Sequence, residues 1–169
     1  MTFEKEELSN KQEVVLDALT INKKISLFKV QPWVLVFTNQ RLIVSVITPE
    51  MQKKAAKETK GYLNKIGIIN QIQDRRRFLE MAPNEILSEN PENFVIEYSQ
   101  VSRIEFIRSS IILTGDIDKK NKINSPILKM KYGSEKIKSS VINIKNFQEF
   151  EDSFISNMLD LFGPKFSYK

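Results

Sequence analysis

Residues 33–46, WVLVFTNQRLIVSV, consist of two apolar runs separated by the turn-forming residues TNQR. The runs are rich in valine, isoleucine and aromatic side chains, which favour β-strands. Asn39 tolerates the positive φ angles of tight hairpin turns. Pro32 can open a strand, although it could not lie in the middle of a ladder. The stretch therefore predicts a β-hairpin.

Further strands are expected on both sides of this hairpin. Residues 13–19, EVVLDAL, mix β-branched and apolar residues between polar segments, which favours a strand. Strand character returns at residues 94–115. The segments ILKMKYG and KIKSSVINI alternate between apolar and polar positions and are joined through GSE, as half-buried antiparallel strands are. A long polar hairpin loop, DIDKKNKINSP, precedes them. The chain is thus predicted to be mainly β, with about seven antiparallel strands.

The sequence changes character at Pro49. Residues 49–81 are rich in helix-forming residues, and Thr48 and Pro49 are suited to the cap and to the first position of a helix. Two helices, or one bent helix, are expected, and residues 82–93 are expected to form a loop with one short turn. Between residues 62 and 72 of the helical segment, apolar residues recur at three- and four-residue steps, which predicts one apolar face. This stripe consists of Tyr62, Leu63, Ile66, Ile69 and Ile72.

A helix is also expected at the end of the chain. Asn146 and Glu149 have the spacing of a capping box, and Gly163 followed by Pro164 is a helix stop. One face of this helix is apolar and rich in aromatic residues, so the helix is expected to pack into the core. The residues of this face are Phe147, Phe150, Phe154, Met158 and Leu161.

The order of these elements, antiparallel strands followed by one amphipathic helix, resembles that of pleckstrin-homology-like (PH-like) domains. The residues VLVFTNQRLIVSV resemble the hairpin of GRAM and bacterial PH-like domains, in which a strand leads into Leu-Thr-Asn-x-Arg-Leu. Thr38, Asn39, Arg41 and Leu42 match this pattern, whereas Phe37 stands in the place of the leucine.

A second segment, FVIEYSQVSRIEF, is similar to the family pattern Ile-Pro-Tyr-x-x-Ile-x-x-Val. Tyr98, Val101 and Ile104 fit it, and Glu97 replaces the proline. The resemblance implies one PH-like domain over residues 1–169: a closed barrel of about seven strands from residues 13–47 and 93–162, a C-terminal capping helix, and a helical insertion at about 49–91 after the third strand. PH-like domains bind lipid head groups, peptides or other domains, so the fold alone does not give the function.

Composition excludes several kinds of chemistry. The chain has no cysteine and no histidine, which excludes disulfides, thiolate metal sites and Ser-His-Asp or Cys-His catalysis. Asp116 and Asp118 resemble the start of a calcium loop, but Lys120 occupies a ligand position. We therefore expect no enzyme activity, no cofactor and no small-molecule substrate. The charged N-terminal segment and the lack of a long apolar run predict a cytoplasmic protein.

The net charge of +5 equals the excess of eight basic over three acidic residues within residues 51–82. The sequence therefore predicts a candidate binding surface in the insertion, formed by Lys53, Lys54, Lys57, Arg75, Arg76 and Arg77. Successive arginines on a helix are rotated by ~100°, so no more than two of the three share a ligand.

Several functions remain open at this stage. The apolar stripe suggests a protein partner or self-association, and the basic residues suggest an anionic membrane surface, nucleic acid or a merely solvated helix face. Specific inositide binding is disfavoured, because Lys24 and Lys29 are followed by Gln31 where an arginine would be needed.

Overall fold

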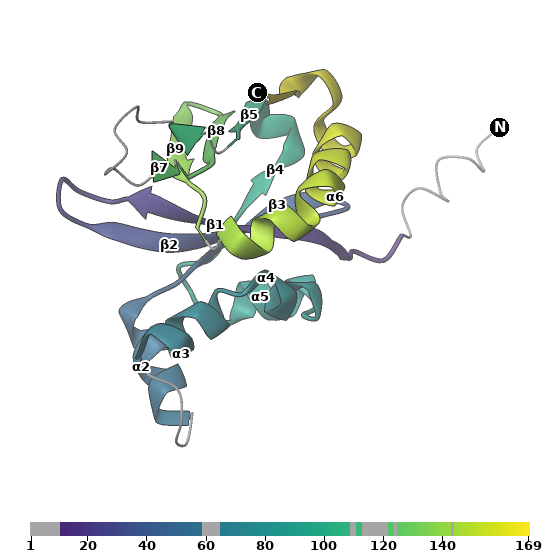
Figure 1. Cartoon of the computed structure of the whole chain (residues 1–169). Helices are drawn as coiled ribbons and strands as arrows, with labels where there is room; N and C mark the ends of the chain where they lie inside the picture. The colour runs from purple at the N-terminus through teal and green to yellow at the C-terminus, as the bar shows by residue number, and fades with distance from the viewer. Residues whose placement is uncertain (1–10, 59–64, 109–110, 113–121, 124, 143) are drawn as a thin grey trace.

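A computed structural model of the chain describes residues 11–58, 65–108, 111–112, 122–123, 125–142 and 144–169 (Figure 1). The strands are β1 (Val15–Lys24), β2 (Val30–Thr38), β3 (Arg41–Val46), β4 (Phe94–Glu97), β5 (Val101–Ile107), β6 (Ile111–Ile112), β7 (Lys122–Ile123), β8 (Ile127–Tyr132), β9 (Glu135–Ser140) and β10 (Phe166–Tyr168). The helices are α2 (Pro49–Glu58), α3 (Lys65–Ile72), α4 (Arg75–Leu79), α5 (Pro83–Ser88) and α6 (Ile144–Phe162), with the 3₁₀ turns η2 (Tyr98–Gln100) and η3 (Gly163–Lys165).

The predicted central hairpin is confirmed. β2 and β3 pair antiparallel from Phe37 opposite Leu42 to Trp33 opposite Val46, and Asn39 and Gln40 form the turn between them. Pro32 does not open the strand as expected: β2 begins at Val30, and Pro32 pairs with Asn22 within the β1–β2 ladder. At this end β2 extends past the end of β3. The β8–β9 hairpin also agrees with the sequence, since Gly133 takes the positive φ angle of 52° that its tight turn requires.

The strands form two four-stranded sheets, in the orders β1-β2-β3-β4 and β10-β5-β8-β9, and β6 pairs with β7. The mainly β architecture with helices is therefore confirmed, but the closed barrel is not. Among the described residues, one isolated bridge between Ile21 and Val141 connects the edges of β1 and β9. The sheets separate because η2 interrupts the chain between β4 and β5, so these two strands belong to different sheets.

An inner core lies between the two sheets. Leu35 and Phe37 from the first sheet meet Ile104 and Phe106 from the second. α6 closes this core with Phe154 and Met158, as its aromatic face predicts, and Phe154 contacts the rings of Phe37 and Phe106. At the end of the helix the buried residue is Phe162, whereas the predicted Leu161 is only partly buried against the core.

The ends of α6 differ from the prediction in one respect. The helix begins at Ile144, so Asn146 lies inside its first turn and is not the cap; the side chains of Asn146 and Phe147 lie outside the described residues. Gly163 ends the helix with a φ angle of 52°, as expected. The chain then continues into β10, which pairs in parallel with β5 and buries Phe166 beyond the expected end of the fold.

Within residues 49–81, where the sequence predicts two helices or one bent helix, the described part of the insertion contains the three helices α2, α3 and α4. Thr48 caps α2 as expected, since its Oγ1 accepts a hydrogen bond from Met51 N at 3.2 Å. Asp74 caps α4. The segment expected to be a loop with one short turn contains the six-residue helix α5, which has Pro83 at its first position and a hydrogen bond from Ala82 N to Glu85 Oε2 at 3.3 Å.

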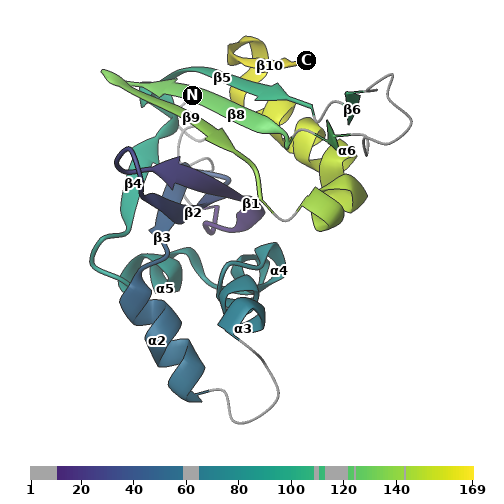
Figure 2. The ribbon, with the colours of Figure 1, turned by 60° about the vertical axis from the view of Figure 1, so that its left-hand side comes forward.

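α4 and α5 cover the outer face of the first sheet, and α2 and α3 extend away from it (Figure 2). Phe78 of α4 and Ile86 of α5 are fully buried against Val34, Val36 and Ile43 of the sheet. We call this second cluster the outer core. The molecule therefore has three layers: the second sheet, the first sheet and the helices α4 and α5.

Candidate functional site

Two of the three successive arginines of the insertion make internal contacts, and one of them, Arg75, attaches the insertion to the rest of the molecule. Arg75 Nε lies 2.7 Å from Oδ1 of the buried Asp17, and its guanidinium lies 3.9 Å from the centre of the Phe150 ring. Arg77 pairs with Glu89, and burial lowers the pKa of its guanidinium. Both side chains therefore serve internal contacts.

Arg76 presents its charge to solvent. Its guanidinium pairs with Asp74 at 3.2 Å, and the same carboxylate accepts the backbone N–H of Arg76. Burial would raise the pKa of Asp74, but these hydrogen bonds and the charges of Arg76 and Arg75 hold it below its ordinary value. Each of the three arginines thus has a carboxylate of its own.

Lys53, Lys54 and Lys57 occupy exposed positions on α2, where Lys54 lies 3.9 Å from Glu58. Exposed pairs of this kind contribute ~0.3–0.5 kcal/mol and leave the charges accessible. These lysines stay a candidate surface. Lys54 and Arg77 line the same pocket, together with the acidic residues Glu58 and Glu89. Arg75 does not line it, because its guanidinium lies against Asp17 and Phe150.

The apolar stripe is described only in part. Ile72 is half-buried and packs against the outer core. Ile66 and Ile69 lie in α3, but their side chains are outside the described residues, as are Tyr62 and Leu63 altogether. A partner-facing role of these four residues stays a prediction.

The clearest candidate site lies elsewhere, at the end of the β1–β2 hairpin. We call residues 23–30 the hairpin tip. Phe28 is 100% exposed and Leu27 is 80% exposed, and Val30 and Ile25 are 60% and 48% exposed. These four belong to the six large hydrophobic residues classed as exposed in the described part of the chain. The tip therefore gathers four of the six in one apolar patch, while Val14 and Leu159 are exposed elsewhere.

Hydrogen bonds shape the tip as a compact turn. Lys29 N donates to Ser26 O at 3.4 Å, while Ile25 N and Ser26 N both donate to Lys29 O, at 2.9 and 3.2 Å. Leu27 and Phe28 are thus the two central residues of a β-turn and form its apex. Three backbone N–H groups of the tip are bonded within the turn, which lowers the cost of moving it into a less polar medium.

Lysines surround the apolar apex. Lys24 and Lys29 are exposed on either side of it, and the Lys23 ammonium lies 5.5 Å from the centre of the Trp33 ring. None of the three forms an ion pair with a residue that the structure describes. The tip therefore combines exposed apolar side chains with uncompensated positive charge.

The sequence contains a signal for this site that the motif comparison misses. The comparison with inositide-binding hairpins uses only the polar residues Lys24, Lys29 and Gln31 and leaves out the apolar residues between them. Four apolar residues within the six residues ISLFKV, flanked by lysines, are unusual for a hairpin loop, where polar, glycine and proline residues dominate.

No family model, curated protein or solved structure matches this chain. Within the described ranges, no group of three or more acidic side chains is placed to hold a metal ion. In the same part of the chain, no helix has the length and hydropathy needed to cross a lipid bilayer.

Proposed function

We propose that the protein is a non-enzymatic PH-like interaction module that docks on anionic membrane surfaces through the hairpin tip. The observation that carries this proposal is the complete exposure of Phe28 at the apex of a turn between Lys24 and Lys29. Peripheral membrane binding usually has two components. Apolar side chains enter the membrane interface, and lysines contact the anionic head groups.

The PH-like part of the proposal is supported by the order of elements. Seven strands of the two four-stranded sheets, β1 to β5, β8 and β9, pair antiparallel and precede α6, and the short β6–β7 pair lies between β5 and β8. α6 contributes Phe154, Met158 and Phe162 to the core between the sheets, as the closing helix of such a domain would. A cytoplasmic location belongs to the same proposal, because the cytoplasmic leaflet carries the anionic lipids.

The tip suits a membrane better than the insertion does. Arg75 and Arg77 of the insertion are engaged with Asp17 and Glu89, whereas the lysines of the tip have no acidic partner in the described chain. Exposed aromatic and aliphatic side chains adjoin the tip lysines directly, and such residues are what an interface-binding segment needs.

The expected affinity is modest. Burial of a leucine or phenylalanine side chain contributes about 1.5–3 kcal/mol, and each lysine near an anionic surface contributes about 1 kcal/mol. Two of each give about 5–8 kcal/mol, which corresponds to dissociation constants from sub-millimolar to about micromolar. Binding should therefore be reversible and sensitive to salt.

Co-sedimentation with vesicles tests the apolar contribution. Wild-type protein should bind phosphatidylcholine vesicles that contain phosphatidylserine and bind vesicles of phosphatidylcholine alone much less. Phe28→Ser should weaken binding by about tenfold or more, because about 1.5 kcal/mol or more of apolar burial is lost. Leu159→Ser, which removes a 51% exposed leucine from α6, is the matched control and should bind like wild type.

The charge contribution is measured in the same assay. Lys24→Gln/Lys29→Gln removes two charges and should weaken binding by about 30-fold, from ~1 kcal/mol for each lysine. Lys53→Gln/Lys57→Gln removes the same charge from α2 and should have little effect. If the α2 variant loses binding and the tip variant does not, the insertion is the membrane surface; if wild type shows no preference for anionic lipid, the membrane role is wrong.

A further inference from the structure

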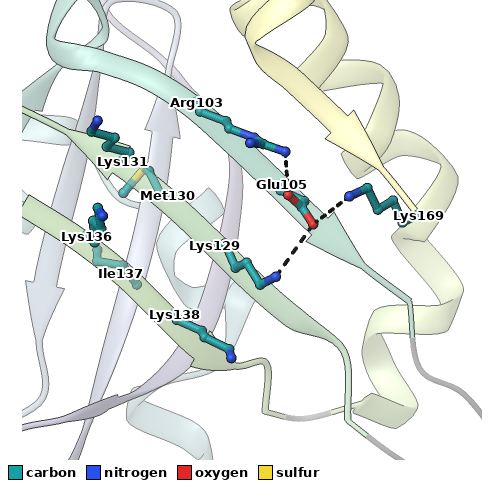
Figure 3. Close-up of a pocket in the computed structure, with 9 residues that line it drawn as sticks. All are labelled: Arg103, Glu105, Lys129, Met130, Lys131, Lys136, Ile137, Lys138 and Lys169. Atoms are coloured by element: carbon teal, nitrogen blue, oxygen red, sulfur yellow. Dashed lines mark hydrogen bonds and ion pairs between the residues drawn. The ribbon is translucent and has the colours of Figure 1, made fainter.

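The outer face of the second sheet carries a groove of about 540 Å³, which we call the basic groove (Figure 3). Its charged lining residues are Arg103, Glu105, Lys129, Lys131, Lys136, Lys138 and Lys169. Ile104, Met130 and Ile137, which alternate with them along β5, β8 and β9, have their side chains in the inner core, so the cations project to the opposite face. Six positive charges thus face a single carboxylate.

The register of the strands places like charges directly opposite one another. Lys129 is paired with Lys138, and Lys131 is paired with both Lys136 and Arg103. Like charges in such positions destabilise a sheet. This repulsion occurs at three cross-strand pairs. An anion bound on the outer face of the second sheet would neutralise it.

Glu105 compensates only one side of the groove. Its buried carboxylate lies 3.0 Å from Arg103, 3.2 Å from Lys169 and 3.8 Å from Lys129. Burial alone would raise the pKa of Glu105, but the hydrogen bond from Lys169 and the neighbouring charges hold it below its ordinary value. The carboxylate therefore stays ionised and forms ion pairs with these three cations.

The other side of the groove is uncompensated. Lys131, Lys136 and Lys138 are exposed, and none forms an ion pair with a residue in the described ranges. Lysines on an edge strand can serve to prevent aggregation, which would account for Lys136 and Lys138 on β9. It does not account for Lys131, because β8 lies inside the sheet between β5 and β9.

The spacing of the lysines indicates the kind of anion. Opposite residues on antiparallel strands have Cβ atoms about 5 Å apart, and alternate residues along a strand are about 7 Å apart. Lys129, Lys131, Lys136 and Lys138 therefore form a four-cornered array of point charges, which suits several phosphate groups a few bonds apart. No aromatic side chain lines the groove within the described chain, so stacking platforms for bases are missing there.

We propose that the basic groove binds a small anion or head group that carries two or more phosphate groups. This site does not rest on the proposed membrane role, because it shares no residue with the hairpin tip. The ligand would bridge the uncompensated lysines of β8 and β9, while Glu105 holds the remaining cations in place beside it.

Titration calorimetry of the full chain with inorganic tripolyphosphate tests this site. Wild type should bind, and Lys131→Gln/Lys136→Gln should bind roughly tenfold more weakly or worse, because two phosphate contacts are lost. Lys53→Gln/Lys57→Gln removes the same charge from α2 and should stay within about twofold of wild type. Absence of wild-type binding both to tripolyphosphate and to the bisphosphate vesicles described below, or equal losses in both variants, would overturn the proposal.

Thermal unfolding separates a binding role from a structural one. Without ligand, Lys131→Gln/Lys136→Gln should melt at or above the wild-type temperature, because a repulsive pair is removed. Tripolyphosphate should raise the wild-type Tm and leave that of the variant nearly unchanged. A variant that melts clearly lower without ligand would mean that the lysines stabilise the sheet, which contradicts the proposal.

A third arm distinguishes free phosphate from a lipid-borne source. Phosphatidylcholine vesicles that contain phosphatidylinositol bisphosphate are compared with vesicles of equal charge made with phosphatidylserine. A loss in the groove variant on the bisphosphate vesicles alone would assign the site to a head group, and a loss with tripolyphosphate alone would assign it to a free anion. Phe28→Ser should keep tripolyphosphate binding, and an oligonucleotide that binds more tightly than tripolyphosphate would overturn the small-ligand assignment.

Discussion

The residues that carry the resemblance to the GRAM-like hairpin hold the turn together. Thr38 Oγ1 accepts a hydrogen bond from Arg41 N at 2.9 Å, and the Arg41 guanidinium pairs with both carboxylate oxygens of Glu13 at 2.9 and 3.0 Å. Asn39 Oδ1 accepts from Val14 N at 2.9 Å. The motif therefore fastens the segment before β1 to the β2–β3 turn, which is a structural role.

Tyr98 completes this network from the second matching segment. Its hydroxyl donates to the carbonyl oxygen of Thr38 at 2.6 Å, and its ring packs edge-on against Phe162 at 5.1 Å. Burial raises the pKa of Tyr98 far above its usual value, so the hydroxyl remains a donor at physiological pH.

Replacing Tyr98 with phenylalanine isolates the contribution of this hydrogen bond. Tyr98→Phe keeps the ring and should lower the free energy of unfolding by about 1–2 kcal/mol, measured by urea denaturation. Tyr132→Phe is the matched control, because the half-buried Tyr132 hydroxyl has no hydrogen-bond partner among the described residues. An equal loss in both variants would show that the bond to Thr38 contributes nothing specific.

At the scale of elements, the sequence predicts what is local and misses what depends on distant contacts. The hairpin of residues 33–46 is predicted because its turn and its strands lie in one short segment. The position of the insertion is not predicted, because α4 meets the first sheet only through tertiary packing. A signal for it exists: Val34, Leu35, Val36 and Phe37 are consecutive apolar residues, the pattern of a strand covered on both faces.

The two cores explain that pattern residue by residue. Leu35 and Phe37 point into the inner core, whereas Val34 and Val36 point into the outer core. The insertion is therefore part of the hydrophobic interior, and removing it would expose the outer face of the first sheet. Two of the arginines on which the charge-based binding roles depend, Arg75 and Arg77, are paired with Asp17 and Glu89.

Truncating Phe78 tests the outer core directly. Phe78 is fully buried beneath the first sheet, so Phe78→Ala should lower the free energy of unfolding by about 3–5 kcal/mol. Arg76→Ala changes an exposed residue of the same helix and should cost about 0.5 kcal/mol or less. A small effect of Phe78→Ala on the denaturation midpoint would mean that the helices are only loosely attached.

At the scale of the whole molecule, the charge balance along the sequence hides the charge distribution in space. The residues outside positions 51–82 have a net charge of zero. The sequence therefore predicts a basic surface only in the insertion. In the folded chain, however, Glu13, Asp17 and Glu105 are acids that pair internally. The lysines of the hairpin tip and the groove residues Lys131, Lys136 and Lys138 are thereby left without an acidic partner among the described residues. Sequence order gives no means of detecting that.

Both candidate sites therefore depend on the pairing of strands. The tip is exposed because β1 and β2 extend beyond their neighbours, with Lys24 opposite Val30 at the last pair. The basic groove exists because the β5–β8–β9 register aligns Arg103, Lys131 and Lys136. Alternation predicts which side of each strand is polar, but the register decides which charges meet.

The central claim, that the hairpin tip enters an anionic membrane, is tested most directly with a fluorescent label. The chain has no cysteine, so Ser26→Cys and Ala56→Cys each allow one environment-sensitive label, at the tip and on an exposed position of α2. On addition of phosphatidylserine-containing vesicles, the label at position 26 should shift to the blue and brighten, while the label at position 56 should not respond. A response at position 56 alone, or at neither position, would contradict the account.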